Sequence, residues 1–432
     1  MLLSTALIGA ALLAPVTAAT AVGETCQGRP ATIVGPAPGG LRGIDGTEGP
    51  DVIVMNGSGS VLALGGDDLI CVTGNLEVYV YAGEGNDVVD ASQTTGTTTV
   101  LGAGDDTYLG SAARDIVTAG AGPYDDTGKD VISTGPRSEL RDTVDTGQPG
   151  QPNSDEVRAG YVDVEWHGSA TGAGVLDGGA DSLLRLQPET WGMSINNDLG
   201  VLASARWPQN QSISGFTDFT VQSRPGLTHF AFGGSTRDET LTFDSLRKKV
   251  LFQVSMGNGD DELSVVSLGT THRNASFSGG RGSDHLSLVM PQVSDVDLDL
   301  ARGRLSTGRG KGEETVAARG FEHAMVEARD VEVVGTPASN DITAEACRAT
   351  VRGLGGRDSI AAVTTRGVSN AGELRCRGAR RMRFHGDAGN DRLFGSAGSD
   401  VLVGGPGRDR ADGGRGRDTC SAETVKRCEV RR

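Results

Sequence analysis

The sequence predicts an all-β fold, a right-handed parallel β-roll or β-helix in which glycine-rich turns separate short strands. Three observations favour this solenoid. Glycine supplies 66 of the 432 residues, about twice its usual share. Short segments rich in β-branched residues, such as 52–54 and 331–334, recur between the turns, and the second alternates valine with glutamate, which is the period of a strand. Glycine and aspartate recur at nine-residue intervals, as expected when one unit repeats along an axis.

The most regular segment is a tandem of four nine-residue units at residues 386–421, with glycine at the first and fourth positions and aspartate at the sixth. Glycine permits a tight turn with positive φ, and the strand that follows directs its eighth residue inward. The units contribute Gly386, Gly389 and Asp391; Gly395, Gly398 and Asp400; Gly404, Gly407 and Asp409; and Gly413, Gly416 and Asp418.

Two such units per coil stack Asp391 over Asp409 and Asp400 over Asp418. Stacked carboxylates repel one another, whereas Ca²⁺ takes six to eight oxygen ligands from carboxylates and main-chain carbonyls. The tandem therefore predicts calcium sites. We expect its first two units to be the better ones, because Arg408 in the third unit occupies a fifth position that is small or polar in the first two.

The same turn recurs earlier in the chain and supplies further predicted calcium ligands. Its aspartates are Asp51, Asp68, Asp87, Asp106, Asp115, Asp238, Asp261, Asp284 and Asp358. Spacings of 23 residues in the centre predict wider coils there, whereas residues 119–160 break the rhythm and are expected to form projecting loops. A longer echo places Gly215-Phe216 and Gly320-Phe321 at a distance of 105 residues.

These units resemble the RTX, or haemolysin-type, calcium-binding repeats, whose pattern is G-G-x-G-x-D-x-U-x with U apolar. The resemblance implies a β-roll that binds Ca²⁺ and folds on binding it. The glycine-rich and arginine-rich composition and the cysteines are similar to those of secreted calcium-binding proteins of actinobacterial type. The division we expect is a signal peptide at 1–21, an RTX-like solenoid at 22–160, a wider central solenoid at 161–345, a C-terminal roll at 346–421 and a stapled tail at 422–432.

The start of the chain and its cysteines indicate a secreted, extracellular protein. An apolar run precedes small residues that end in Ala-Thr-Ala at 19–21, which is typical of a cleaved signal peptide. No later segment is long and apolar enough to span a membrane. Six cysteines fit an oxidising compartment, and among fifteen possible pairings we favour Cys26 with Cys71, Cys347 with Cys376 and Cys420 with Cys428.

The sequence offers little for catalysis, so we expect no enzyme. It lacks the His-Glu-x-x-His of metalloproteases and the Gly-x-Ser-x-Gly of many hydrolases. The alternative is a β-helical polysaccharide-modifying enzyme with a groove in 161–345, where His285 beside Asp284 or the pair Asp260 and Asp261 would be the first residues to test. A net charge of −16 disfavours nucleic acid. The basic run 375–383 indicates an extracellular or cell-wall polymer as a partner besides calcium.

Overall fold

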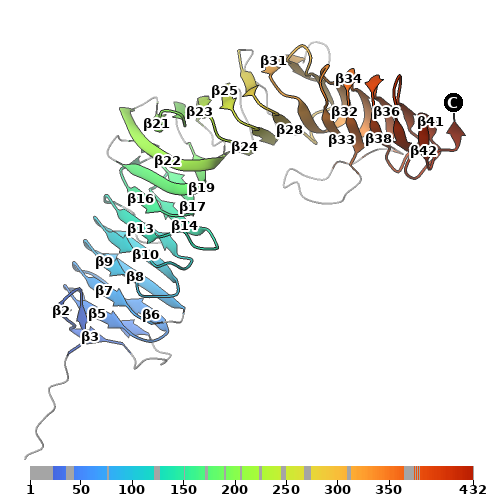
Figure 1. The fold of residues 1–432 in the computed structure, drawn as a ribbon. Coiled ribbons are helices and arrows are strands. Elements are labelled where there is room, and N and C mark those ends of the chain that lie inside the picture. Colours follow the sequence, from blue (N-terminus) through green and yellow to red (C-terminus); the bar gives the residue numbers. More distant parts are fainter. Residues whose placement is uncertain are drawn as a thin grey trace, which may run out of the picture.

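The chain forms a long, mostly parallel β-solenoid that bends near its middle (Figure 1). This computed structural model describes residues 23–35, 43–74, 77–120, 127–149, 151–170, 174–188, 191–204, 207–222, 226–244, 250–266, 274–308, 313–363, 374, 376, 378 and 380–431. The segment interpreted as a signal peptide lies outside them. Throughout the described part every regular element is a strand. No helix there is long and apolar enough to cross a membrane.

The first part of the solenoid consists of short strands, two or three to a coil. They are β1 (Thr25–Cys26), β2 (Arg29–Pro30), β3 (Ile33–Val34), β4 (Ile44–Asp45), β5 (Val52–Met55), β6 (Gly59–Leu62), β7 (Leu69–Val72), β8 (Val78–Glu84), β9 (Val88–Asp90), β10 (Thr97–Ala103), β11 (Thr107–Leu109), β12 (Ile116–Thr118), β13 (Val131–Gly135), β14 (Asp142–Thr146), β15 (Pro152–Asn153), β16 (Glu156–Ala159), β17 (Val162–His167) and β18 (Ser169–Ala170).

The central strands are longer, as expected for wider coils. They are β19 (Val175–Gln187), β20 (Trp191–Asn196), β21 (Val201–Ser204), β22 (Trp207–Gln222), β23 (Leu227–Gly233), β24 (Thr240–Asp244), β25 (Leu251–Asn258), β26 (Glu262–Val266), β27 (Ser276–Arg281), β28 (His285–Val289), β29 (Asp295–Asp299), β30 (Arg304–Thr307), β31 (Glu314–Arg319) and β32 (His323–Val334).

Apart from β33, the C-terminal strands are short again, and they continue to the end of the described chain. They are β33 (Asp341–Arg352), β34 (Gly355–Gly356), β35 (Ser359–Ala362), β36 (Arg381–His385), β37 (Ala388–Gly389), β38 (Arg392–Phe394), β39 (Val401–Val403), β40 (Arg410–Asp412), β41 (Thr419–Ser421), β42 (Thr424–Lys426) and β43 (Val430–Arg431).

Each coil pairs in parallel with the next, so equivalent apolar residues stack into a narrow core. On one face Ile53 pairs with Ile70, Ile70 with Val89, and Val89 with Tyr108, and all four are fully buried. In the C-terminal roll the weakly apolar Ala411 lies in register with Leu393 and is also buried. A single column of side chains fills each face, which explains why a chain with 4% aromatic residues can fold.

The expectation of projecting loops at residues 119–160 was wrong for most of that segment. β13 and β14 pair with the preceding strands β11 and β12, and β16 follows β13 in the same way. The ladder of paired strands is therefore continuous here, although the strands are unevenly spaced in the sequence. Sequence spacing hid this continuity because the coil length varies.

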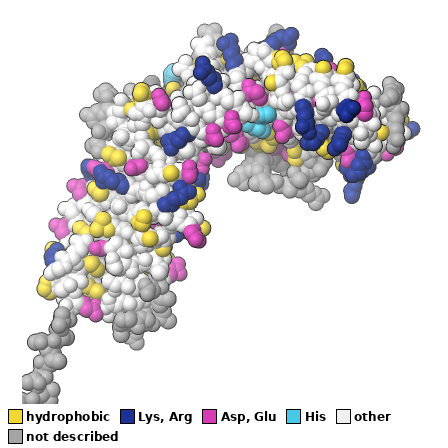
Figure 2. Space-filling view, viewed as in Figure 1, with side chains coloured by type: hydrophobic (Ala, Val, Ile, Leu, Met, Phe, Trp, Pro, Cys, Tyr) yellow, Lys and Arg dark blue, Asp and Glu magenta, His cyan; other side chains and the backbone are white. Residues whose placement is uncertain are grey.

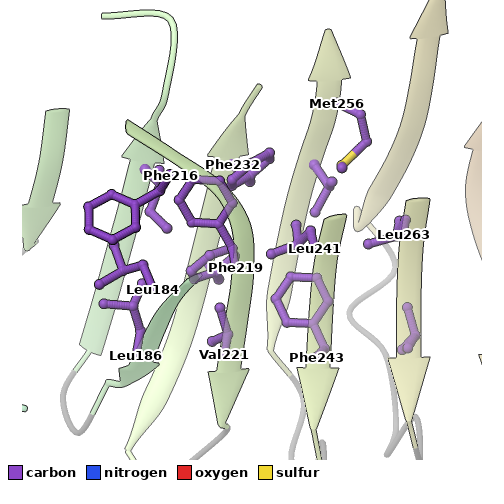
Figure 3. Close-up of a cluster of buried hydrophobic side chains, with 14 of the residues drawn as sticks. Leu184, Leu186, Phe216, Phe219, Val221, Phe232, Leu241, Phe243, Met256 and Leu263 are labelled. Atoms are coloured by element: carbon purple, nitrogen blue, oxygen red, sulfur yellow. The ribbon is translucent and has the colours of Figure 1, made fainter. Parts of the chain in front are cut away.

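The wider central coils are filled by aromatic side chains (Figure 3). Phe219 packs edge to face against Phe232, with ring centroids 5.1 Å apart, and Phe243 packs in the same way against Phe252 at 4.7 Å. These rings replace the single valine or isoleucine of the narrow coils, since a wider cross-section needs more volume to reach native packing density.

Two β-hairpins are inserted into one face of the solenoid, and they share one topology. In the first, β20 and β21 lie between β22 and β23; in the second, β29 and β30 lie between β31 and β32. On the opposite face β22 pairs directly with β24, and β28 directly with β32. Each hairpin therefore lengthens one face by two strand spacings, or about 10 Å, which accounts for the bend of the axis around β21–β24 in Figure 1.

The 105-residue echo in the sequence marks this duplication. Gly200 and Gly303 close the two hairpin turns with φ of 64° and 65°. Asn196 Oδ1 accepts the N–H of Leu199, and Asp299 Oδ1 accepts the N–H of Arg302, both at 2.9 Å. The hairpins are equivalent down to single hydrogen bonds.

All three expected disulfides are present. Cys26 is bonded to Cys71, Cys347 to Cys376 and Cys420 to Cys428. The Cys26–Cys71 bond joins the β1–β2 hairpin to strand β7, which is the third strand in the stack β3, β5 and β7. The Cys420–Cys428 bond joins the final repeat to the C-terminal tail. Both ends of the rod are thus covalently closed.

Candidate metal-binding turns

The sixth-position aspartates form buried ladders along the edges of the solenoid. Asp391 donates its main-chain N–H to Asp409 Oδ1 at 2.9 Å, and Asp400 donates to Asp418 Oδ1 at the same distance. Each of these side chains is at most 1% exposed. The stacking expected from the 18-residue period is therefore confirmed, and one carboxylate oxygen of each rung is used to join adjacent coils.

The ladders run through most of the molecule. The N-terminal ones comprise Asp51, Asp68, Asp87, Asp106, Asp130 and Asp155 on one edge and Asp115 and Asp142 on another; the central one comprises Glu239, Asp261, Asp284 and Glu322; the C-terminal ones comprise Asn340, Asp358, Asp391, Asp409 and Glu423, and Asp400, Asp418 and Glu429. Three ladders end on a glutamate, whose longer side chain accepts the main-chain N–H of the last aspartate. These glutamates are Glu322, Glu423 and Glu429.

Several rungs were missed or misplaced by sequence. Asp130, Asp142 and Asp155 belong to the segment interpreted as loops. The central ladder begins with Glu239, whose amide donates to Asp261 Oδ1 at 2.9 Å, and not with Asp238, which is exposed. The register of that unit is one residue later than assigned, because its first glycine is Gly234.

A second, outer ladder uses the fifth position and was not anticipated. Asn86 donates its N–H to Asp67 Oδ1, and Asp105 donates to Asn86 Oδ1. Asp260 likewise donates to Asp238 Oδ1 at 2.8 Å. In this outer ladder the main-chain N–H of the later coil donates to a side chain of the earlier coil, which is the opposite direction to the buried ladder. The first aspartate of a Gly-Asp-Asp sequence therefore indicates the outer ladder and the second indicates the buried ladder.

Two kinds of turn present the buried carboxylates. In the first kind, which we call open turns, the second and fourth residues both have positive φ, as at Gly405 (112°) and Gly407 (158°). The other carboxylate oxygen then has no hydrogen-bond partner in the described structure although it is buried. Such Oδ2 atoms belong to Asp68, Asp87, Asp261, Asp284, Asp358, Asp391, Asp409 and Asp418.

In the second kind, which we call capped turns, the second residue is serine or threonine and satisfies the carboxylate. Ser396 donates its N–H and its hydroxyl to Asp400 Oδ2, the latter at 2.9 Å, and its hydroxyl also accepts the N–H of Gly398. Equivalent pairs are Thr47 with Asp51, Ser111 with Asp115, Ser235 with Glu239 and Thr336 with Asn340. These turns hold no spare carboxylate oxygen.

The first-position glycines of the tandem do not adopt the positive φ that was expected of them, and their lack of a side chain matters for a different reason. Gly386 and Gly404 lie outside the left-handed region. A Cβ at Gly386 would come within 2.3 Å of Asp391 Oδ2, and one at Gly404 within 2.2 Å of Asp409 Oδ2. At these two positions glycine leaves room for the carboxylate that folds back over its Cα, whereas the open turns of Asp68 and Asp261 have Ala63 and Met256 at the first position.

Burial makes the open-turn carboxylates difficult to ionise without a cation. It raises the pKa of Asp68, Asp87 and Asp261 to about 7 each, and adjacent ladder carboxylates add to the effect. The pKa of Asp358 rises to about 6 for the same reasons. The pKa values of Asp391 and Asp418 are also raised, mainly by burial.

The donor set fits Ca²⁺ better than a metal bound by side chains alone. Among the described residues no group of three or more His, Cys, Asp and Glu side chains converges as a metal cage. Calcium needs only oxygen, and each open turn offers one buried, unpartnered carboxylate oxygen beside the carbonyls of a glycine-rich turn. The open turns pass this test; the capped turn of Asp400, expected to be among the best, does not offer such an oxygen.

The residues singled out for catalysis lie in stacked coils of the central part of the solenoid. His285 and His323 stack in adjacent coils, with ring centroids 6.4 Å apart. His323 Nδ1 accepts the N–H of Asp341 at 2.9 Å, so the neutral ring carries its proton on Nε2, 2.7 Å from Ser283 Oγ. A ring in this tautomer donates to serine and does not take its proton. Asp260 lies in the outer ladder.

Comparison with known families matches the turns described above. The model of the RTX calcium-binding nonapeptide repeat matches four copies, at residues 101–122 and 385–420. No curated protein matches the chain. The matched segments contain both open turns, such as those of Asp391 and Asp409, and capped turns, such as those of Asp115 and Asp400. The chain therefore carries RTX calcium-binding nonapeptide repeats within a longer parallel β-solenoid.

Proposed function

We propose that this protein is a secreted, calcium-stabilised rod with a structural or surface-interaction role and no active site. The observation that carries the proposal is the row of buried, unpartnered Oδ2 atoms in stacked open turns. On the C-terminal edge these belong to Asp358, Asp391 and Asp409 in successive coils. Among the described residues these buried carboxylates have no positively charged partner, and a cation bound between such turns would offset their negative charge.

Calcium binding is expected to complete folding of the rod. Without the ion, ionised aspartates repel along each ladder, and glycine-rich turns lose much entropy on ordering. Extracellular modules bind Ca²⁺ with dissociation constants of about 10⁻⁴ to 10⁻³ M, so about 1 mM Ca²⁺ contributes roughly 0.4 to 1.4 kcal/mol per site. Several sites together reach the size of a domain's net stability.

Secretion is supported by two features. Three disulfides, with no free cysteine in the described residues, suit an oxidising compartment. The apolar, alanine-rich first residues resemble a cleaved signal sequence. Low cytoplasmic calcium would keep the chain unfolded until export.

A structural role is supported by how the polar groups are used. Ladder carboxylates, the outer ladder and the His323 ring all take part in bonds between coils. One groove, at the second hairpin, favours a polymer-binding role in addition.

The decisive experiment follows folding of the disulfide-bonded protein by circular dichroism and calorimetry during titration with Ca²⁺. We expect calcium to raise the melting temperature and sharpen the transition, while Mg²⁺ at equal concentration has little effect because it demands a smaller, more rigid octahedral site. A chelator should reverse the change. Identical melting in calcium, magnesium and chelator would refute the proposal.

A further inference from the structure

The two equivalent hairpins each border a groove on the same face of the solenoid. The first groove is lined by β20, β21, β23 and β25, and the second, with a volume of about 460 Å³, by β29, β30, β32, β33 and β36. The duplication supplies a comparison within one chain. Residues that the hairpin needs in order to fold should occur in both grooves. A feature that occurs in only one groove is therefore not needed for folding of the hairpin.

Charge is such a feature. Ser194 in the first groove corresponds to Asp297 in the second, and its strand neighbour Ala231 to Glu332. Leu251 and Gln253 correspond in the same way to Arg348 and Thr350. The first groove has His229 at the place of Asp330 and no Asp, Glu, Lys or Arg in its described lining. The second is lined by five carboxylates and three guanidinium groups, those of Asp295, Asp297, Glu313, Asp330, Glu332, Arg348, Arg381 and Arg383. Packing of the hairpin does not demand these charges.

The charged residues form two rows that cross the strands of the second groove. Asp330, Arg348 and Arg381 are in register in one row, and Glu332, Thr350 and Arg383 in the other. Arg348 is held by Asp330 through two hydrogen bonds of 2.7 Å, from Nε and Nη2. Each row thus passes from acidic to basic along the axis of the rod.

Two guanidinium groups in this groove are available to a ligand. Arg381 and Arg383 are exposed and line the groove, and no ion pair of the described residues includes either of them. They lie two residues apart on β36, so their side chains leave the same face about 6.6 Å apart at the backbone. They also belong to the basic run noted in the sequence, part of which lies outside the described residues. Figure 2 shows Lys and Arg side chains gathered over the C-terminal part of the rod.

The arrangement matches a particular ligand chemistry. Guanidinium forks bind carboxylate or sulfate groups through paired hydrogen bonds. Carboxylates such as Asp297 and Glu332, together with the Thr350 hydroxyl, accept hydrogen bonds from sugar hydroxyls but repel a densely charged polymer. A groove that crosses successive strands suits an extended chain. Widely spaced negative charges separated by hydroxyl groups are the property of acidic polysaccharides.

We propose that the groove at the second hairpin binds a linear polysaccharide bearing carboxylate groups, with Arg381 and Arg383 as the residues that contact those groups. The groove at the first hairpin, whose described lining has no arginine, has no such role. This binding site is independent of the calcium-dependent folding proposed above, because none of its residues belongs to an open turn.

The test measures binding of the calcium-loaded protein to hyaluronan, a uronate polymer, and to its neutral methyl ester. Wild type should bind hyaluronan, more weakly as salt rises, and should not bind the ester. The double variant Arg381→Ala, Arg383→Ala should bind at least about tenfold more weakly, the equivalent of about 1.4 kcal/mol. The matched control is Arg392→Ala, Arg410→Ala, an exposed arginine pair in register on β38 and β40 that removes the same charge.

Melting in calcium shows that each variant is folded before its affinity is compared. Retained affinity in the Arg381 and Arg383 variant, an equal loss in the control, equal binding of the ester, or failure of wild type to bind hyaluronan would each overturn the proposal. Dextran sulfate serves as the second anionic probe. Displacement of hyaluronan by dextran sulfate would extend the site to sulfated polysaccharides, while binding of dextran sulfate alone would overturn the assignment to carboxylates.

Discussion

The two edges of the C-terminal roll use the same nonapeptide in different ways. On one edge Asp358, Asp391 and Asp409 keep an unpartnered oxygen in open turns. On the other, Ser396 occupies both oxygens of Asp400. The ladder bond to the next coil is the same on both edges, at 2.9 Å. The second residue of the unit, and not the aspartate, therefore decides whether a turn can offer a carboxylate to a cation.

The position of the capped turns gives this difference a physical reason. Each begins a ladder, with Asp51, Asp115, Glu239, Asn340 or Asp400 as the first rung. At a first rung no earlier carboxylate lies below to share a cation. A serine or threonine hydroxyl and its own N–H then stabilise the rung, as in other short turns that such residues close. One first rung is an asparagine, which carries no charge at all.

The sequence was sufficient for the repeat, the stacking and the disulfides, because each depends on spacing or on a residue type that stands out. It was insufficient for the choice between open and capped turns. That choice depends on the second position, which the RTX pattern gives as glycine, whereas the expected order of the sites rested on the fifth position. From the open-turn geometry we now expect Asp409 to be the better calcium site and Asp400 the poorer one, which reverses the order expected from the sequence.

The errors in the fold also have specific causes. Residues 119–160 looked irregular in the sequence because successive ladder aspartates there lie 24, 27 and 25 residues apart, which hides the nine-residue period while the strand register is kept. Glu239 was missed because a longer acidic side chain fills the place of aspartate. The hairpins left only the Gly-Phe echo at 215 and 320, since antiparallel insertions alternate apolar residues as the coils do.

The largest contrast between the two turns should come from their glycines. Gly66, in the open turn of Asp68, has φ of 106°, and a Cβ there would lie 2.5 Å from the carbonyl carbon of Gly49. Gly49, in the neighbouring capped turn, has open space around its Cβ position. Gly66→Ala should reduce the free energy of unfolding by about 3 kcal/mol or more, and Gly49→Ala by less than about 1. Urea denaturation measures both, and equal losses would contradict the distinction.

The pH dependence of the metal-free protein is expected to be the next largest effect. The folded-state pKa of Asp68, Asp87 and Asp261 is raised to about 7, above the value near 4 of an unfolded chain. Their protonated forms therefore favour folding below about pH 4, and this contribution to the free energy of unfolding is lost as pH rises to about 7.

Calcium should reverse this trend, because protons and Ca²⁺ compete for the same oxygens. Thermal unfolding in chelator and in calcium across this pH range tests the prediction. Parallel pH profiles in the two buffers would show that the ladder carboxylates do not bind the ion.

Replacing one aspartate on each edge of the C-terminal roll distinguishes the contribution of calcium binding from that of the hydrogen bonds between stacked coils. The substitution Asp409→Asn keeps an oxygen for the N–H of Asp391 but removes the charge, so stabilisation by about 1 mM Ca²⁺ should fall by roughly 0.4 to 1.4 kcal/mol. Asp400→Asn should leave the calcium response unchanged, as the native Asn340 occupies an equivalent capped turn. Calorimetry with and without calcium measures the difference. An equal loss in both variants would mean that capped turns also bind.

The smallest effect is expected when a capped turn is converted into an open one. This substitution also tests most directly whether the second residue of the unit decides between the two kinds of turn. Ser396→Gly gives the unit of Asp400 the second-position glycine found at Gly405 and Gly414 in the two following units. Loss of the hydroxyl bonds should lower metal-free stability by about 1 kcal/mol. Because Asp418 lies in the next coil with an unpartnered Oδ2, the freed carboxylate of Asp400 should join it and increase the stabilisation by calcium. A variant that is weakened equally with and without calcium would show that more than the second residue is needed to open the turn.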